Sequence, residues 1–309
     1  MTGTLHVPVM LETVLQMLAP RAGGVFLDAT VGLGGHAEAI LGFPGTQVVG
    51  LDVDPAALEH CRRRLAPFGT RAALVEASYA QLERVLAELR IGPLAGVLFD
   101  LGVSSLQLDT PERGFSFRHD APLDMRFSPT GPTAAQWLAE VAEEDLVSVL
   151  RELGEEPRAR RVARALVRAR EREPLSTTGQ VRRIVAAALG HPHGRIDPAT
   201  RTFQAIRMAV NRELEGLPAA LEAAARRLAP GARLVVIAFH SLEDRISKRT
   251  FRHLSGRCVC PPGTPECACR PESLLEPLTR RPLQPSEAEV AANPRARSAR
   301  LRAAQRRAP

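Results

Sequence analysis

The first hundred residues alternate short apolar runs with amphipathic stretches. Apolar runs occur at 25–30, 47–54, 71–77 and 96–100, and a helical period separates them, for example over 81–89. Pro55 directly follows the second run, which suits the first turn of a helix. Strands that alternate with helices imply right-handed crossovers and a parallel sheet covered on both faces. This part of the chain therefore predicts an α/β core.

The alternation stops after Asp100 and returns near residue 203. Between about 108 and 200 the pattern predicts only helices, such as 134–141 and 158–173. A helical stretch at 203–228 and a strong strand at 233–239 follow. We therefore expect a discontinuous α/β domain, 1–107 with 201–309, interrupted by an all-helical insertion at 108–200.

Composition excludes several classes of protein. No apolar run approaches the roughly 18 residues that a membrane helix needs. The first six residues lack the basic and apolar regions of a secretory signal. Five cysteines in 309 residues do not make a disulfide scaffold. The expected location is a reducing cytoplasm.

The positive charge is concentrated at the end of the chain. The formal net charge is +7, and residues 291–309 carry six arginines and no acid, so the rest of the chain is close to neutral. Such a local excess favours contact with a polyanion. A solvated, partly disordered tail has the same composition.

A glycine-rich turn follows the first predicted strand. The segment 28–36 reads DATVGLGGH, and Asp52 ends the second strand 20 residues after Gly32. Glycines let backbone N–H groups approach a ligand at a helix N-terminus, and an acid at this spacing can accept ribose hydroxyls. The pair indicates a nucleoside-bearing cofactor. Gly32, Gly34 and Ala37 also satisfy a loose dinucleotide pattern, so a nicotinamide cofactor stays open.

Polar and aromatic residues follow the fourth strand, at the sheet edge where ligands of open α/β folds bind. Asp100 to Gln107 (DLGVSSLQ) comes first, and then come RGFSF and PLDMR, which contain Arg113, Phe115, Phe117, Asp124 and Arg126. Rings beside arginines suit an unpaired base and its phosphates. Core packing under a loop accounts equally well for each ring.

Three further segments carry candidate chemistry. The helix at 158–173 aligns Arg161, Arg164 and Arg168 on one face, and a solvated face paired with Glu171 and Glu173 is the simpler interpretation. Arg201 and Asn211 belong to the helical stretch that follows the insertion, and His240, Ser241 and Asp244 follow the fifth strand. Ser, His and Asp at nearly adjacent positions cannot form a nucleophile–base–orienter line, and no G-x-S-x-G elbow is present, so a hydrolase is excluded.

Four of the cysteines are grouped within twelve residues. Cys258-x-Cys260 and Cys267-x-Cys269 flank Pro261-Pro262-Gly263. The thiols could hold zinc, although familiar pairs are spaced C-x₂-C. Zinc, a redox-labile disulfide and unligated loop thiols all stay open, and no metal is assigned.

Together these blocks resemble the RsmH (MraW) family, bacterial S-adenosylmethionine-dependent methyltransferases that act on cytosine N4 of small-subunit (16S) ribosomal RNA. The segments that carry the resemblance occur in order from residue 6 to residue 298: DLGVSSLQLD, RGFSF, PLDMRF, ATRTFQAIRMAVNRELE, FHSLEDRI and NPRARS. The resemblance implies a Rossmann-like class I methyltransferase core, with a parallel-rich sheet and a helical insertion that contacts RNA.

The resemblance also implies site residues. The cofactor positions fall on Gly34, Gly35 and His36 in the loop, Asp52 for the ribose, Tyr79 near the adenine, and Asp100 with Gln107 near the methionyl end. Many amino-methyltransferases carry Asp/Asn-Pro-Pro-aromatic after the fourth strand, where this chain has Asp100-Leu101-Gly102-Val103. The roles of that motif therefore do not transfer, and Asp100 is the candidate acceptor for the N4 hydrogens.

The expected partner is small-subunit rRNA, within the assembled or assembling 30S particle, with the target cytosine unpaired or flipped out of its helix. A homodimer is compatible with the sequence. Two rival functions stay open on the residues alone. They are a nicotinamide-dependent oxidoreductase and a non-catalytic ribosome-assembly factor that retains the fold.

Overall fold

The computed structural model describes residues 8–190 and 197–308, and the chain folds into two compact units. The sheet unit comprises 1–102 and 215–309, and the helical unit comprises 103–214. Within the described ranges, none of the helices has both the length and the apolar composition needed to cross a bilayer.

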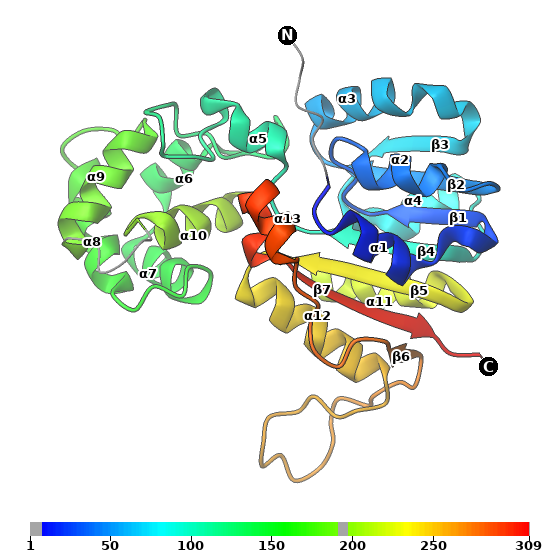
Figure 1. The fold of residues 1–309 in the computed structure, drawn as a ribbon. Helices are drawn as coiled ribbons and strands as arrows, with labels where there is room; N and C mark the ends of the chain where they lie inside the picture. The colour runs from blue at the N-terminus through cyan, green and yellow to red at the C-terminus, as the bar shows by residue number, and fades with distance from the viewer. Residues whose placement is uncertain (1–7, 191–196, 309) are drawn as a thin grey trace. The chain divides into compact units, whose positions relative to one another are not determined.

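The sheet unit is built on seven strands in the order β3-β2-β1-β4-β5-β7-β6 (Figure 1). The strands are β1 (Gly24–Asp28), β2 (Thr46–Asp52), β3 (Ala72–Glu76), β4 (Leu94–Asp100), β5 (Leu228–Ala238), β6 (Leu275–Pro277) and β7 (Arg300–Arg306). The first five are parallel, and β7 runs antiparallel to both β5 and β6. The predicted parallel α/β core is confirmed.

Helices cover both faces of this sheet (Figure 1). One face packs against α1 (Leu11–Leu18), α2 (Gly35–Leu41) and α3 (Pro55–Leu65). The other carries α4 (Leu82–Glu88), α11 (Leu217–Arg227) and α12 (Ser241–Leu254). The central strands are apolar throughout because both of their faces are covered. Val97, Leu98 and Phe99 of β4, for example, are fully buried.

The helical unit has its own apolar core. Its helices are α5 (Ser105–Asp109), α6 (Ala134–Glu140), α7 (Glu143–Glu152), α8 (Ala159–Arg170), α9 (Thr178–Leu189) and α10 (Thr200–Asn211). Leu138, Leu150, Leu166, Val181 and Ile206 meet in that core. The unit extends past both expected boundaries, 108 and 200, because α10 packs against α6 and α7. The stretch predicted as one helix at 203–228 is therefore split between the two units.

The arginine-rich end of the chain is not a solvated tail. After α13 (Glu287–Ala292) and a 3-10 turn at Pro294–Ser298, the chain forms β7 between β5 and β6. Leu301 pairs with Ile237 and is fully buried. Arg302, also buried, donates through Nε and Nη2 to the Asp244 carboxylate, at 2.6 and 3.1 Å. Of the two alternatives that the sequence left open, a partly disordered tail is excluded over Arg300–Arg306, because this pair lets an arginine enter the sheet. Contact of the other arginines with a polyanion stays a prediction.

Candidate functional site

The glycine-rich loop after β1 has a backbone that only glycine adopts readily. Gly32 and Gly34 have φ of +50° and +80°. The Gly32 N–H donates to Asp52 Oδ2 at 2.8 Å, which joins the loop to the end of β2. A Cβ on Gly34 would lie 2.7 Å from the Sγ atom of Cys61 in α3, so any larger residue would push the loop away from that helix.

Gly35 has a different reason to be glycine. A Cβ there would lie 2.3 Å from Cγ of Pro8, so its missing side chain makes room for that proline. The structure therefore gives Gly35 a packing role, and its expected place at the cofactor stays a prediction.

Three carboxyl groups gather at the ends of β1, β2 and β4. Burial raises the pKa of Asp28 to about 7, and nearby His36 opposes this shift, while Asp100 and Asp52 add to it. Burial also raises the pKa of Asp52 to about 6, against backbone hydrogen bonds from Asp54 and Gly32. Carboxyl groups that resist ionisation at close quarters form a site that favours a cation.

Two side chains at this edge have buried polar atoms without a hydrogen-bond partner among the described residues. Nδ1 and Nε2 of His36 and Oδ1 of Asp100 form no hydrogen bond in the described part of the structure. The two side chains face each other, with His36 Nε2 3.5 Å from Asp100 Oδ2. Thr30 connects this pair to the loop, because its hydroxyl accepts from the Asp100 N–H at 2.7 Å. Since buried polar atoms are normally paired, these three mark a place for a polar ligand.

Tyr79 lies just past β3, at the same edge of the sheet. Its ring is half-buried and meets Phe99 of β4 edge-on, with centroids 5.9 Å apart. Ser78 and Gln81 form a reciprocal capping box that fixes the backbone of this turn. The structure thus brings Gly34, His36, Asp52, Tyr79 and Asp100 to one edge. Asp28 was not among the sequence candidates, although its position at the end of a strand before the glycines was a usable signal.

Gln107 belongs to the helical unit, unlike the other expected cofactor positions. It is buried and forms a capping box with Ser104 at the start of α5, where its Oε1 accepts from the Ser104 N–H at 2.9 Å. This accounts for the side chain locally. Its expected role near the cofactor stays a prediction.

The polar residues of the helical unit that the sequence proposed for substrate binding form hydrogen bonds within and around the loop that precedes α6. Arg113 donates to the carbonyls of Arg126 and Phe127, and Arg126 forms a bidentate pair with Asp124 at 2.7 and 2.8 Å. Asn211 of α10 accepts from the Phe127 N–H and donates to the Met125 carbonyl, both at 2.7 Å. These contacts order the loop, and a role toward substrate stays a prediction.

The two aromatic candidates pack inside the helical unit. Phe115 is buried and stacks on Phe127, with centroids 5.4 Å apart. Phe117 is half-buried and meets Phe203 edge-on at 4.7 Å. Of the two interpretations open on the sequence, the core-packing one accounts for both rings as the structure places them.

The remaining sequence candidates lie at helix starts. Arg201 is an exposed residue in the first turn of α10. His240 precedes α12 and forms a capping box with Glu243, and Ser241 is the first residue of that helix. Asp244 is committed to Arg302. His240 therefore has a structural role, and contact of these residues with substrate stays a prediction.

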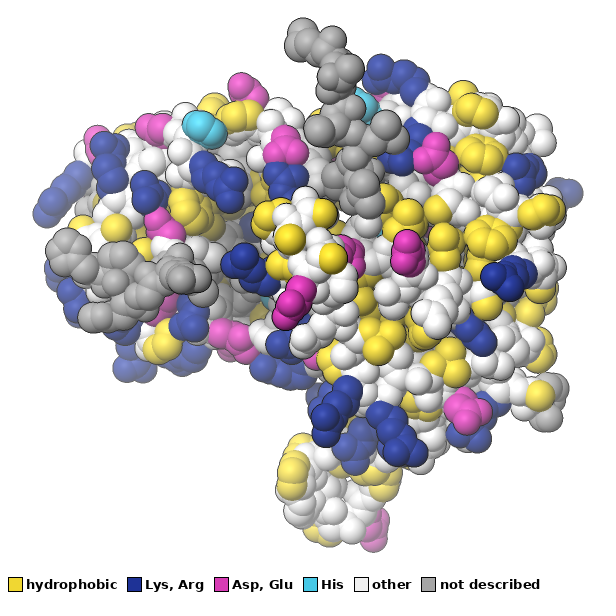
Figure 2. Space-filling view, viewed as in Figure 1, with side chains coloured by type: hydrophobic (Ala, Val, Ile, Leu, Met, Phe, Trp, Pro, Cys, Tyr) yellow, Lys and Arg dark blue, Asp and Glu magenta, His cyan; other side chains and the backbone are white. Residues whose placement is uncertain are grey.

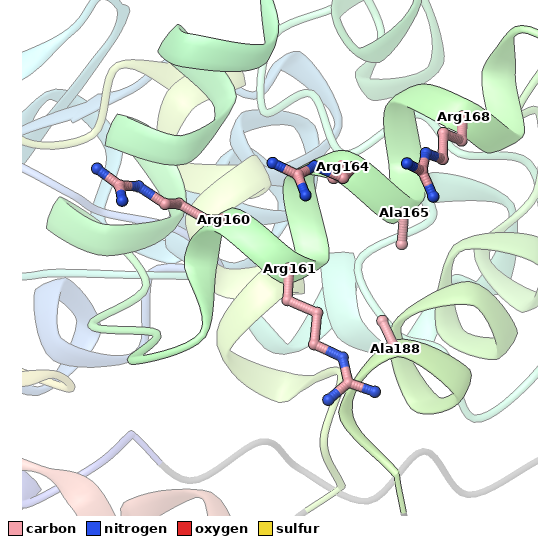
Figure 3. A pocket seen from close by; sticks show the side chains of 6 residues that line it. All are labelled: Arg160, Arg161, Arg164, Ala165, Arg168 and Ala188. Carbon is pink, nitrogen blue, oxygen red and sulfur yellow. The ribbon is translucent and has the colours of Figure 1, made fainter.

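A hollow on the helical unit is lined almost wholly by arginine. Arg160, Arg161, Arg164 and Arg168 of α8 line it, together with Ala165 of the same helix and Ala188 of α9 (Figure 3). Arg164 approaches Glu143 at 3.7 Å, rather than the Glu171 or Glu173 expected from the sequence. Figure 2 shows further arginine side chains, in dark blue, across this unit. The sequence pointed to this face but favoured simple solvation.

Comparisons with known proteins agree over nearly the whole chain. The model of the MraW methylase family matches residues 3–307. The chain is 51% identical over 303 residues to ribosomal RNA small subunit methyltransferase H of Symbiobacterium thermophilum, covering 96% of this chain and 95% of that protein. It is 51% identical over 306 residues to the protein of the same name from Syntrophotalea carbinolica, covering 97% and 98%. Among solved structures, an rRNA methylase from Streptococcus thermophilus aligns over 99% of this chain and 100% of its own, with 12% identity and a TM-score of 0.43.

Proposed function

Because the chain belongs to the MraW methylase family, we infer that it is an S-adenosylmethionine-dependent methyltransferase acting on small-subunit (16S) ribosomal RNA. The group methylated is the exocyclic N4 of a cytidine. The match over residues 3–307 is the observation that carries this conclusion. Family membership also decides against the nicotinamide-dependent oxidoreductase that the glycine pattern left open.

The edge formed by β1, β2 and β4 fits this cofactor. The unpaired buried atoms of His36 and Asp100 need a polar ligand, and the surrounding carboxyl groups suit a cationic one. In our proposal Asp52 accepts hydrogen bonds from the ribose hydroxyls and Tyr79 lies beside the adenine. Asp100 and Gln107 serve the methionyl end.

In the proposed methyl transfer, the protein contributes mainly by positioning the two reactants. Bound S-adenosylmethionine supplies a methyl group on a sulfonium. N4 is a poor nucleophile because its lone pair is delocalised into the ring, so the protein must hold it in line and accept its N–H bonds. Asp100 is the candidate acceptor, since its Oδ1 is buried and unpaired. His36, 3.5 Å from the other oxygen, orients that carboxylate.

Methyl transfer from labelled cofactor tests the function directly. Small-subunit particles from cells lacking this gene should accept label faster than naked rRNA from the same cells, and nucleoside mass spectrometry should identify N4-methylcytidine. Particles from normal cells, already modified, are the matched control and should accept little. Binding of S-adenosylmethionine without transfer to either substrate would instead indicate a non-catalytic assembly factor.

Three finer features belong to the same proposal. The substrate is the assembled or assembling 30S particle, because selection of one rRNA site requires shape as well as a base. The protein acts in the cytoplasm, where that particle forms. A homodimer stays a prediction, which sedimentation of the purified protein would test.

Asp52→Ala is expected to weaken S-adenosylmethionine binding by about 1.5–3 kcal/mol, the scale of a lost charge-assisted hydrogen bond. Isothermal titration calorimetry measures this change. Glu76→Ala is the matched control, because Glu76 is an exposed acid at the end of β3, paired in register with Asp52. Affinity within about twofold of wild type for Asp52→Ala would remove the ribose assignment.

The affinity for S-adenosylmethionine is expected to rise about tenfold from about pH 5 to about pH 8. The pKa of Asp28 is raised to about 7 and that of Asp52 to about 6, so both carboxyl groups become anionic over this interval and attract the sulfonium. In the ligand-free protein, the same raised pKa values stabilise the fold below about pH 4, and this contribution is lost as the pH rises through 6 and 7.

Calorimetry at both ends of that interval measures the dependence. S-adenosylhomocysteine is the matched ligand, since it keeps the amino-acid part but lacks the sulfonium charge, and its affinity should rise less. Asp28→Asn should flatten the profile for S-adenosylmethionine. A flat profile in the wild type would show that these carboxyl groups do not face the cation.

The arginine face of α8 is our candidate contact for RNA phosphates. Replacing Arg160, Arg164 and Arg168 together by Gln is expected to lower the slope of log K against log salt by about 2–3, because each phosphate contact adds roughly 0.7–0.9. Filter binding to rRNA over a salt series measures the slope. Arg62→Gln with Arg63→Gln, on exposed positions of α3, is the matched control. An unchanged slope in the triple variant would show that this face does not contact RNA phosphates.

A further inference from the structure

Four cysteine sulfurs converge in the loop between α12 and β6. The Sγ atom of Cys267 lies 3.5 Å from that of Cys258 and 3.4 Å from that of Cys269, and Cys258 and Cys269 are 3.7 Å apart. With Cys260 included, all four sulfurs lie within 4.8 Å of one another. The loop extends away from the strands of the sheet unit (Figure 1), and it takes no part in the site described above.

The spacing of these sulfurs is that of metal ligands and not of disulfides. A disulfide bond is about 2.05 Å long. Zinc–sulfur bonds of about 2.3 Å in a tetrahedron place the sulfurs about 3.8 Å apart. The observed 3.4–3.7 Å separations approach that edge length and exceed a covalent bond by more than 1 Å. All four sulfurs also lie within 4.8 Å of one another, whereas disulfides would divide them into two pairs.

The loop has no apolar core that could account for this convergence. Residues 257–270 are exposed or half-buried throughout, and 261–268 are all exposed. Backbone hydrogen bonds close the base of the loop, where the Gly256 N–H donates to the Glu272 carbonyl at 2.8 Å and the Leu274 N–H to the Leu254 carbonyl at 2.8 Å. Figure 2 shows the loop standing clear of neighbouring side chains at the lower edge of the molecule. A segment that cannot bury apolar surface needs another source of order, which a metal supplies.

The surroundings suit a centre of four thiolates. The N–H groups of Val259 and Cys260 donate to the sulfurs of Cys269 and Cys258, both at 3.4 Å, as backbone amides do around ligating thiolates. Four thiolates with one divalent ion carry two negative charges. Arg257 and Arg270, adjacent to the first and last cysteine, supply the opposite charge.

We propose that Cys258, Cys260, Cys267 and Cys269 form a closed, structural Zn²⁺ site that holds this loop in its fold. Zinc has no geometric preference from its d electrons and is the usual ion of four-cysteine structural sites. Binding converts the four thiols to thiolates and releases their protons to solvent, with no change of oxidation state. The site lies apart from the cofactor edge, so its role is to shape a surface of the sheet unit.

Metal analysis of the full-length protein, purified without chelator, tests the proposal. We expect about one zinc per chain in wild type and in Glu266→Gln, and a loss of at least tenfold in Cys267→Ser. Cobalt added to the metal-free protein should produce the strong visible absorption of tetrahedral thiolate ligation. Iron in place of zinc, or equal zinc in Cys267→Ser, would overturn the assignment.

Two further measurements separate zinc from a disulfide and from misfolding. In denaturant with chelator, all five cysteines should titrate as free thiols, and a count of three or one would overturn the proposal in favour of disulfides. Trypsin should cut after Arg257 at least tenfold faster in metal-free protein, because only the loop loosens. The circular dichroism of the sheet and helical units should stay unchanged. Equal cleavage rates with and without metal would show that the ion does not order the loop.

Discussion

A chain that ends at Ala299 is expected not to fold. The cut removes β7, which lies between β5 and β6, and leaves β6 without a neighbour in the sheet. It removes the buried Leu301 and leaves Asp244 buried without Arg302. A core leucine is worth about 2–5 kcal/mol, and an unpaired buried charge costs about 3–5 kcal/mol. Together these amount to about 5–10 kcal/mol, which is comparable with the 5–15 kcal/mol that stabilises a typical domain. Circular dichroism and solubility of the truncated protein measure the loss.

A single substitution of Arg302 tests the contribution of β7 to stability in a chain that can still fold. Arg302→Met should lower the free energy of unfolding by about 3–5 kcal/mol, measured in urea. Arg297→Met is the matched control, since Arg297 is exposed in the preceding turn, and it should change stability by less than about 0.5 kcal/mol. Replacing both partners, with Asp244→Leu, should recover most of the loss. Equal stability of Arg302→Met and Arg297→Met would show that the Arg302–Asp244 pair does not stabilise the fold.

Asp100→Asn is expected to slow methyl transfer about 100-fold or more at saturating S-adenosylmethionine. The amide keeps the shape of the carboxylate but loses its charge, so it accepts the N4 hydrogens less well as the nitrogen pyramidalises. Single-turnover rates on rRNA particles measure the chemical step. Calorimetry on the same variant measures cofactor binding separately.

The two measurements distinguish two roles for Asp100. A lower rate at saturating cofactor supports the acceptor. A weakened affinity with a normal rate at saturation would make Asp100 a cofactor ligand only. Asp124→Asn is a useful comparison, because Asp124 is bound to Arg126 in the helical unit and its loss should leave the affinity for cofactor unchanged.

The sequence predicted the strands that rely on apolar burial. The runs at 47–54 and 96–100 appear as β2 and β4, because both faces of these strands are covered. It did not predict β7, because Ala and Arg dominate 300–306 and neither favours strands by propensity. This segment forms a strand because it pairs with β5 and because Arg302 binds Asp244. Both are tertiary contacts, which local sequence does not show.

The sheet edge that we propose for the cofactor could also be predicted largely from the sequence. Glycines and an acid at fixed spacing point to Gly34 and Asp52 as candidates, because the ends of β1 and β2 meet at one edge of a parallel sheet. The packing of Phe115 and Phe117 was not visible, since their partners Phe127 and Phe203 are set by the fold. The convergence of four thiols was undecided for the same reason: C-x-C spacing does not say whether two hairpin arms meet.

The position of the helical unit within the chain has a consequence for the order of assembly. Asp100 pairs with Ile237, so closing the β4–β5 ladder joins points separated by roughly 140 residues of chain. If the helical unit, with its own core and mostly local contacts, folds first, only about 25 flexible residues remain between those points. The logarithmic cost of loop closure then falls by about 1.5 kcal/mol. The insertion thus costs the sheet less entropy than its length suggests, provided that the helices form before the central strands meet.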